Sequence, residues 1–293
     1  NAVRPTFQRC GPLTQCTQNA WPDADVIRDK LTLCAVDVGE HRPQRIRDAD
    51  RNSVNVNFDC ISVLGHPPTL SGINGPSQTQ RDVAKLNRME LTSLSIVPGQ
   101  QISTVFAMGK PDPETRATFA DNVSPHLRWS GAPEGTRSFA IVVHDSDAPT
   151  VPDDVNQEGR RVPAELPRAD FFHWVLVDVP ADQTEIVEAA FSAEVTPGGK
   201  PGPESGEALR AGLNSYTGWF AGDPDMGGEY FGYDGPFPPW NDERTHNYTF
   251  TVYALDVDRA PVEGTFDGPT VLAAIEGHIL DSASFEATHR IAD

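Results

Sequence analysis

The sequence predicts a mainly β protein, in which residues 89–293 form an antiparallel β-fold with peripheral helices and residues 1–88 form an irregular N-terminal extension. From residue 89 onward, compact apolar segments rich in β-branched and aromatic residues alternate with long loops, and helical patterns are few. Before that point apolar periodicity is weak, and Gly, Pro and Ser gather at 65–80, as is typical of a linker. We therefore expect two parts, 1–88 and 89–293.

Local patterns place the individual elements. In the first part, 34–40 and 53–65 have the composition of short strands. In the second part the expected strands are 89–96, 138–145, 171–180, 247–257 and 282–291. The segment 269–280 has apolar residues three to four positions apart, which predicts a helix packed on a core. Long loops are expected at 150–170, 195–210 and 221–244, and long loops on a rigid sheet often carry binding groups.

Charge is distributed unevenly along the chain. Residues 1–88 contain 11 Lys and Arg against 9 Asp and Glu, whereas residues 89–293 contain 12 against 33. The strongly acidic second part excludes nucleic-acid binding by general electrostatics. The acidity indicates solubility, or alternatively a first part that packs through charge on the second part or on a partner protein. No apolar run is long enough for a transmembrane segment.

All four cysteines lie within the first 60 residues, at Cys10, Cys16, Cys34 and Cys60. An even number in a loop-like segment predicts two disulfides, with three pairings open, although buried free thiols are the alternative. The chain starts with Asn1 rather than Met, and a removed signal peptide is one explanation. Together these features predict an extracytoplasmic protein, periplasmic or secreted.

Several polar groups fall at the ends of expected strands. Asp145 and Asp147 end the strand at 138–145, and His173 opens the next strand. His246 and Tyr248 are two positions apart, so they share one face of a strand. Two acids on one face repel each other, so we expect a compensating positive charge. Each feature alone is more typical of turn capping or core packing than of a site.

The order and spacing of five segments are more specific. These are "SPHLRWSGAPEGTRSFAIVVHDSDAP", "FFHWVLVDVP", "GYDGPFPP", "HNYTFTVYALD" and "IEGHIL". Together they resemble the phosphatidylethanolamine-binding protein family, and most closely its bacterial, YbhB/YbcL-like branch. The resemblance covers residues 89 to about 290 and does not extend to 1–88.

The resemblance implies an antiparallel β-sandwich-like fold with a small surface pocket for phosphate-like or carboxylate anions, including phospholipid head groups. The family's pocket residues correspond here to Asp145, Asp147, His173, Gly235, Pro236, His246 and Tyr248. No cofactor and no metal is implied. A protein partner bound through residues 1–88 is a further expectation.

A mechanism follows for such a pocket. A carboxylate beside an imidazole fixes its tautomer and raises its pKa, so Asp145 or Asp147 is expected to make His173 or His246 a cationic donor. The anion then contacts histidines and loop N–H groups, Tyr248 adds a hydroxyl, and an ammonium group on the ligand contacts a free carboxylate.

The sequence also departs from the family pattern. Ser146 stands between the two acids where proline is frequent, and Phe237 and Ala120 stand where bacterial members often have cysteine. Phe237 is expected to place an apolar ring near the pocket mouth. The segments 150–170 and 221–230 look long and are expected to cover or narrow the site. Two N-x-S/T sequons, at Asn122 and Asn247, are attributed to chance.

Two other functions stay open. The histidines and carboxylates suit a hydrolase or a metal site, although no G-x-S-x-G or H-E-x-x-H signature occurs, so an enzyme is disfavoured. The other alternative is an accessory subunit of a larger extracytoplasmic assembly, anchored by the extension. A binding protein is the preferred interpretation.

Overall fold

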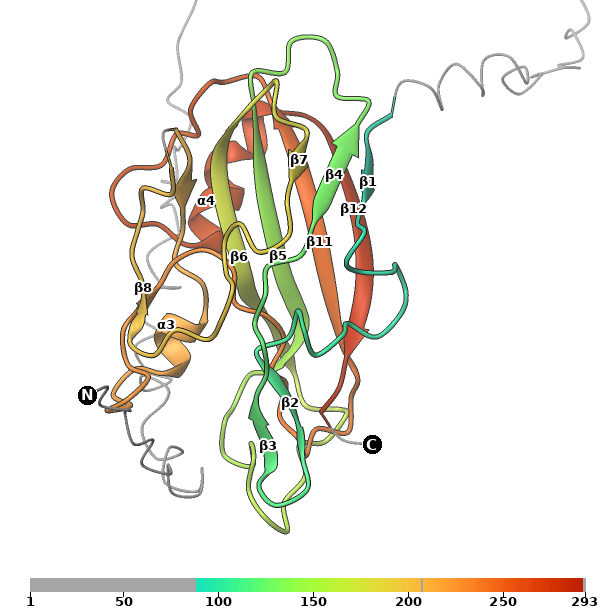
Figure 1. Cartoon of the computed structure of the whole chain (residues 1–293), viewed down its shortest axis with the longest axis vertical. Helices are drawn as coiled ribbons and strands as arrows, with labels where there is room; N and C mark the ends of the chain where they lie inside the picture. Colours follow the sequence, from blue (N-terminus) through green and yellow to red (C-terminus); the bar gives the residue numbers. More distant parts are fainter. Residues whose placement is uncertain (1–87, 207, 292–293) are drawn as a thin grey trace, which may run out of the picture. The chain divides into compact units, whose positions relative to one another are not determined.

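The computed structural model describes residues 88–206 and 208–291 (Figure 1). The predicted strands at 34–40 and 53–65 and the four cysteines lie outside these residues. The proposed boundary between 88 and 89 stays a prediction. In the part of the chain that the model describes, no helix is long and apolar enough to cross a membrane.

A five-stranded antiparallel sheet forms the centre of the fold. Its strand order is β12 (Ile279–His289), β11 (His246–Leu255), β5 (Ser138–Pro149), β6 (Arg168–Pro180) and β9 (Arg210–Ala211). Both faces of this sheet are covered, which explains the nearly continuous apolar run along β5. Phe139, Ile141 and Val143 join one apolar core, and the alternating Ala140 and Val142 join the other.

The first core is closed by a small sheet of β1 (Glu90–Thr92), β4 (Leu127–Ser130) and β7 (Glu185–Ile186). Trp129 of β4 packs edge to face on Phe139 of β5, with ring centroids 5.3 Å apart. The second core is closed by helix α4 (Gly268–Ile275), through Val271 and Ile275. The predicted sandwich-like β-fold with peripheral helices is therefore confirmed.

The remaining elements are short. They are β2 (Gly109–Asp112), β3 (Arg116–Phe119), β8 (Gly199–Lys200), β10 (Glu229–Tyr230), α3 (Tyr216–Trp219) and the 3-10 turn η3 (Glu276–His278). β2 and β3 form an antiparallel hairpin, and β8 pairs with β10 in parallel. In Figure 1, α3 lies near β8, and the β2–β3 hairpin projects from one end of the sheet.

The structure corrects several predicted boundaries. The helix predicted at 269–280 begins at Gly268 behind the N-cap Asp267, whose carboxylate accepts a bond from the Thr270 N–H at 3.0 Å. It ends at Ile275, and η3 and β12 follow directly. The strand predicted at 89–96 shortens to β1.

Strands β5 and β6 are longer than predicted, and this matters for the site. Asp145 and Asp147 lie inside β5 rather than at its end, and His173 lies inside β6. The pairing shifts between Asp145 and Ala148, so β5 bulges where the two acids lie. Both acids are buried and Ser146 between them is exposed, so the acids share one side of the strand.

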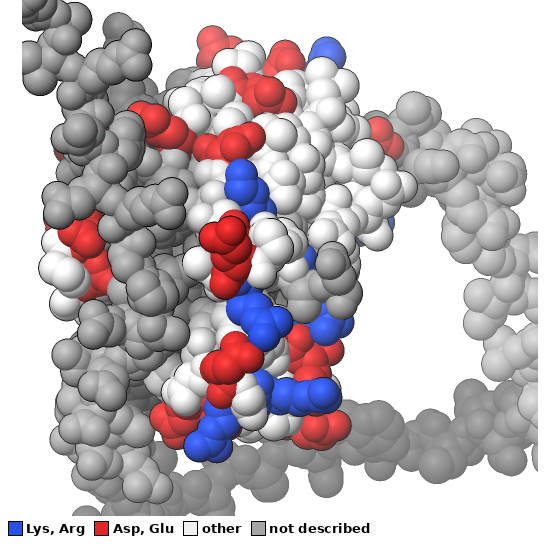
Figure 2. Space-filling model, turned by 60° about the horizontal axis from the view of Figure 1, so that its bottom comes forward, with Lys and Arg blue, Asp and Glu red and all other residues white. Residues whose placement is uncertain are grey.

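The surface carries dispersed charge. Exposed ion pairs join Arg116 to Glu158 at 2.9 Å and Arg161 to Glu243 at 3.4 Å. On the face seen in Figure 2, acidic and basic side chains alternate. That face therefore has no continuous patch of one sign among its described residues.

We expect residues 89–293 to fold without the extension, because the described residues of this part already build two extensive apolar cores. The fragment should give a soluble protein with one cooperative thermal transition, measured by circular dichroism beside the full chain. An insoluble fragment, or one without a cooperative transition, would show that residues 1–88 complete the core.

Candidate functional site

A pocket opens where β5, β6 and β11 meet α3 and two loops. It encloses about 500 Å³, including solvent at its mouth. Four of the predicted site residues line it: Asp145, His173, His246 and Tyr248. The other lining residues are Ala148, Pro149, Pro152, Val155, Asn156, Phe171, Tyr216, Trp219, Phe237, Pro238 and Pro239. Asp147, Gly235 and Pro236 lie outside the lining.

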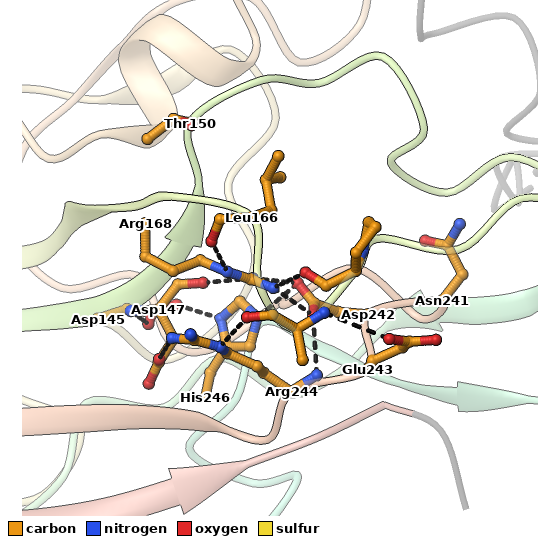
Figure 3. A network of polar contacts seen from close by, with 12 residues as sticks. Asp145, Asp147, Thr150, Leu166, Arg168, Asn241, Asp242, Glu243, Arg244 and His246 are labelled. Atoms are coloured by element: carbon orange, nitrogen blue, oxygen red, sulfur yellow. Dashed lines mark hydrogen bonds and ion pairs between the residues drawn. The ribbon is translucent and has the colours of Figure 1, made fainter.

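His246 is held between two carboxylates at the edge of the pocket (Figure 3). Its Nδ1 is 2.6 Å from Oδ2 of Asp145, and its Nε2 is 3.1 Å from Oδ2 of Asp242. Carboxylates accept hydrogen bonds, so both ring nitrogens act as donors and the ring is an imidazolium. Burial alone would lower the pKa of His246, but the two carboxylates outweigh it and raise this pKa to about 9.

Asp242 is in turn paired with a buried arginine. Arg168 donates from Nη1 to Oδ2 at 2.5 Å and from Nη2 to Oδ1 at 3.0 Å, a bidentate pair. Burial raises the pKa of Asp242, but the bonds from His246 and Arg168 bring it down to about 2. Arg168 also donates to the Asp147 carbonyl oxygen at 2.8 Å, so it ties this network to β5.

Asp147 has partners of its own, which resolves the expected repulsion between the two acids. Its Oδ1 accepts from Arg244 at 2.9 Å, and its Oδ2 accepts from the N–H and the side-chain amide of Asn247 at 3.0 and 2.8 Å. Burial opposes ionisation, but these bonds hold the pKa of Asp147 below its ordinary value. Asp147 thus stabilises the β5–β11 connection and does not reach the pocket.

His173 is neutral, which corrects one prediction. Its Nδ1 lies 2.8 Å from the carbonyl oxygen of Asp234, which can only accept, so Nδ1 carries the hydrogen and Nε2 has a lone pair. Burial lowers the pKa of His173, and the nearby charge of Asp145 only partly offsets this. The prediction of a cationic donor is therefore wrong for His173. Its buried Nε2 has no hydrogen-bond partner.

Tyr248 lies beside both Asp145 and His173. The residue pairs with Asp145 in the β5–β11 ladder, and its ring packs edge to face on His173 at 5.2 Å. Burial, aided by the charge of Asp145 and by a hydrogen bond to its carboxylate, raises the pKa of Tyr248 well above its ordinary value, so the group is a phenol. The described residues offer this hydroxyl no second partner.

The backbone of the Gly-Pro loop, Gly235 and Pro236, forms hydrogen bonds within the protein and offers none to the pocket. The N–H of Gly235 donates to Oδ1 of Asn122 at 2.8 Å, so the expectation that it binds an anion is wrong. A side chain at Gly235 would come within 2.2 Å of the Phe106 carbonyl oxygen, so glycine is needed for this close approach. The Pro236 carbonyl oxygen accepts from the N–H of Met108 at 2.9 Å. The pocket wall is made by the next three residues, 237–239.

Sequence reasoning missed the residues that fix this loop. Asp234 is fully buried and accepts from Asn122 at 2.7 Å, from Asn214 at 2.8 Å and from Lys200 at 2.7 Å. Its carbonyl sets the tautomer of His173. Asp234 belongs to the segment "GYDGPFPP", and this was the one sequence feature that could have pointed to its role. The Asn122 sequon gave no hint of its role, and its fully buried side chain is not available to a glycan.

The departures from the family pattern shape the mouth of the pocket. Phe237 lines it, as predicted, and contacts Phe119 edge to face at 5.8 Å. The long 150–170 segment contributes Pro152, Val155 and Asn156 to the wall. The 221–230 segment contributes no lining residue among those described.

Comparisons with known proteins assign most of the described chain to one family. The profile of the family described as Phosphatidylethanolamine-binding protein matches residues 92–290. The UPF0098 protein YbhB of Escherichia coli strain K12 is 34% identical over 168 residues, which are 57% of this chain and 81% of that protein. The UPF0098 protein YbcL of the same organism is 29% identical over 208 residues, 71% of this chain and 91% of that protein. The crystal structure of E. coli YbcL, described as a new member of the mammalian PEBP family, covers 70% of this chain and 99% of its own, with 26% identity and a TM-score of 0.49.

The charge on His246 predicts a pH-dependent stability. The folded-state pKa of about 9 exceeds the ordinary value of 6.5, so the stabilisation is full below pH 6.5 and is lost as pH rises through 9. The shift corresponds to about 3 kcal/mol. The free energy of unfolding, measured in urea, should therefore differ between wild type and His246→Gln by about 3 kcal/mol less at pH 10 than at pH 6.

His278→Gln is the matched control. His278 also pairs with an aspartate, Asp256 at 2.9 Å, but both side chains are partly exposed. This variant should stay within about 0.5 kcal/mol of wild type throughout. Parallel loss of stability in wild type and His246→Gln would show that His246 is not charged in the folded protein.

Proposed function

Because the chain belongs to the phosphatidylethanolamine-binding protein family, we propose that its pocket binds a small polar ligand: a phosphate-like or carboxylate anion, or a phospholipid head group. The proposal rests on one observation above the others. The buried Nε2 of His173 has no partner among the described residues, and it belongs to a residue that lines the pocket beside the Tyr248 hydroxyl. Buried polar groups normally have hydrogen-bond partners, so this nitrogen suits a bound polar ligand that also reaches Tyr248.

The two atoms require different chemistry from that ligand. The Tyr248 hydroxyl can donate to a phosphate or carboxylate oxygen. The neutral His173 Nε2 needs a donor, such as the P–OH of a singly protonated phosphate or an N–H of an ammonium group. A phosphoethanolamine-like head group carries both kinds of group. Such a ligand satisfies both residues without an imidazolium at His173.

The surrounding geometry favours a binding protein over the alternatives. The pocket lining contains no serine, threonine or cysteine among its described residues, and both nitrogens of His246 are engaged. No described contact favours a hydrolase or an accessory subunit. Modulation of a partner through residues 1–88 and an extracytoplasmic location are part of the proposal, and the location is tested apart from the pocket.

Peptide mapping without reduction tests the location through the cysteines. We expect Cys10, Cys16, Cys34 and Cys60 to be paired with one another, because an even number in a small loop-like segment is typical of exported proteins. Four thiols that alkylate in the native protein would contradict both the pairing and the extracytoplasmic location.

The pocket is tested by calorimetric titration with phosphoethanolamine. His173→Ala should weaken binding about ten- to a hundredfold, because one hydrogen bond to a charged ligand group contributes roughly 1.5–3 kcal/mol. His278→Ala removes a histidine outside the pocket and should leave the affinity unchanged. Equal affinities for wild type and His173→Ala would place the ligand elsewhere, and no binding to wild type would overturn the proposal.

A further inference from the structure

We propose that Lys200 is a positioning residue of this pocket: its ammonium group pairs with the buried carboxylate of Asp234, and His173 therefore stays neutral in the pocket lining. The inference rests on the proposed function and goes further, because it names the group outside the lining that sets the charge state in which His173 meets a ligand. It follows from how the buried charges beside the Gly-Pro loop are paired.

Lys200 lies beside the Gly-Pro loop, with only 13% of its side chain exposed. It belongs to β8, which pairs in parallel with β10. Its Nζ donates to the Asp234 carboxylate at 2.7 Å, to the Tyr233 carbonyl oxygen and to Oγ of Ser192 at 3.4 Å. The Ser192 oxygen accepts this bond, because its own hydrogen is donated to the Glu194 carbonyl oxygen at 3.3 Å. Three donors on one nitrogen identify the charged form, an ammonium.

The carboxylate of Asp234 is fully buried, and all its partners are donors. Besides Lys200, the side-chain amides of Asn122 and Asn214 donate to it at 2.7 and 2.8 Å. The orientation of each amide is fixed, because its oxygen accepts a backbone N–H in turn. Among the residues that the structure describes, Lys200 is the one cation paired with this carboxylate.

The backbone of Asp234 connects this pair to His173. The Asp234 N–H donates to the His173 carbonyl oxygen at 3.0 Å, and the Asp234 carbonyl oxygen accepts from Nδ1 of the ring at 2.8 Å. These two bonds hold the loop against β6, and the Asp234 carboxylate is close enough for its charge to act on the ring. Lys200 therefore influences His173 through Asp234, and no contact between Lys200 and the ring is needed.

Two carboxylates act on the ring of His173, and each has a cation of its own. Asp145 pairs with the His246 imidazolium at 2.6 Å. Asp234 pairs with Lys200 at 2.7 Å. Burial lowers the pKa of His173 below its ordinary value, although both negative charges act to raise it. This balance depends on the pairing, because a buried carboxylate that loses its cation acts more strongly on the titratable groups around it.

Loss of the Lys200 charge would leave Asp234 as a buried anion without a cation, which favours uptake of a proton nearby. The two asparagine amides still favour the charged form of Asp234 itself. The other titratable groups that face the ring of His173 are Asp145 on β5, Tyr216 on α3 and Tyr248 on β11. Asp145 keeps its own cation, and the raised pKa of both tyrosines means that they already carry their protons. We therefore expect the proton on His173.

The test measures the charge state of His173 in the full chain by NMR, from the pH titration of its ring signals, assigned with the help of His173→Gln. In wild type the pKa should lie below the ordinary 6.5. Lys200→Gln keeps a hydrogen-bond donor and removes the charge, so the pKa of His173 should rise by about one unit or more. In the double variant Lys200→Gln/Asp234→Asn neither charge remains, and the pKa should return to the wild-type value.

Lys110→Gln is the matched control. Lys110 on β2 is the other lysine among the described residues, and its charge acts on Asp112 of the same strand. This variant should leave the pKa of His173 unchanged. A wild-type His173 with a pKa above 6.5, or an unchanged pKa in Lys200→Gln, would overturn the inference. A Lys200→Gln protein that does not fold would overturn it as well, because the charge of Asp234 would then destabilise the fold instead of charging His173.

Calorimetric titration with phosphoethanolamine separates this inference from the proposed function. Affinity is measured between about pH 5 and pH 9, on both sides of the ordinary histidine pKa. In Lys200→Gln the pH at which affinity changes should move upward together with the pKa of His173, because the ligand contacts this ring. A pKa that moves while the binding profile stays would support the role of Lys200 and contradict the contact between ligand and His173. Absence of binding to wild type would overturn the proposed function alone, since the NMR titration decides on Lys200 without a ligand.

Discussion

The arrangement of strands and loops around the pocket depends on one buried cation, the imidazolium of His246. It joins the carboxylate of Asp145 on β5 to that of Asp242 in the loop before β11, and Arg168 on β6 completes the chain of charges. Removing one partner from such a buried pair leaves an uncompensated charge, at a cost of about 3–5 kcal/mol. Three strands and the long Gly-Pro loop are therefore held in one arrangement, and the pocket lies in that arrangement.

The two histidines of the site show how a partner decides what an imidazole does. His246 meets carboxylates on both nitrogens, so it is charged and engaged. His173 meets the carbonyl oxygen of Asp234 on one nitrogen only, so it is neutral and keeps a lone pair. The charged histidine stabilises the framework, and the neutral one keeps an unpaired nitrogen in the lining of the pocket. Asp234, itself held by Asn122, Asn214 and Lys200, fixes that difference.

Sequence patterns predicted most of the sheet because a strand is a continuous segment, so its apolar and β-branched residues stand together in the sequence. The resemblance to the family, rather than the alternation, predicted that Asp145, His173, His246 and Tyr248 belong to one pocket, and all four line it. The partners could not be read in the same way. Asp145 and His246 are 101 positions apart, and Asn122 and Asp234 are 112 apart. Which groups pair over such separations depends on register and on a bulge in β5, neither of which has a local signal.

The same limit applies to the state of each pocket residue. Two histidines can be counted in the sequence, but the groups that remain for a ligand are those left after the protein has satisfied its own hydrogen bonds. In this pocket both nitrogens of His246 are engaged, whereas Nε2 of His173 has no partner. Substitutions at the buried partners Asp242 and Asp234 would therefore change which pocket groups are left unpaired, although neither residue lines the pocket.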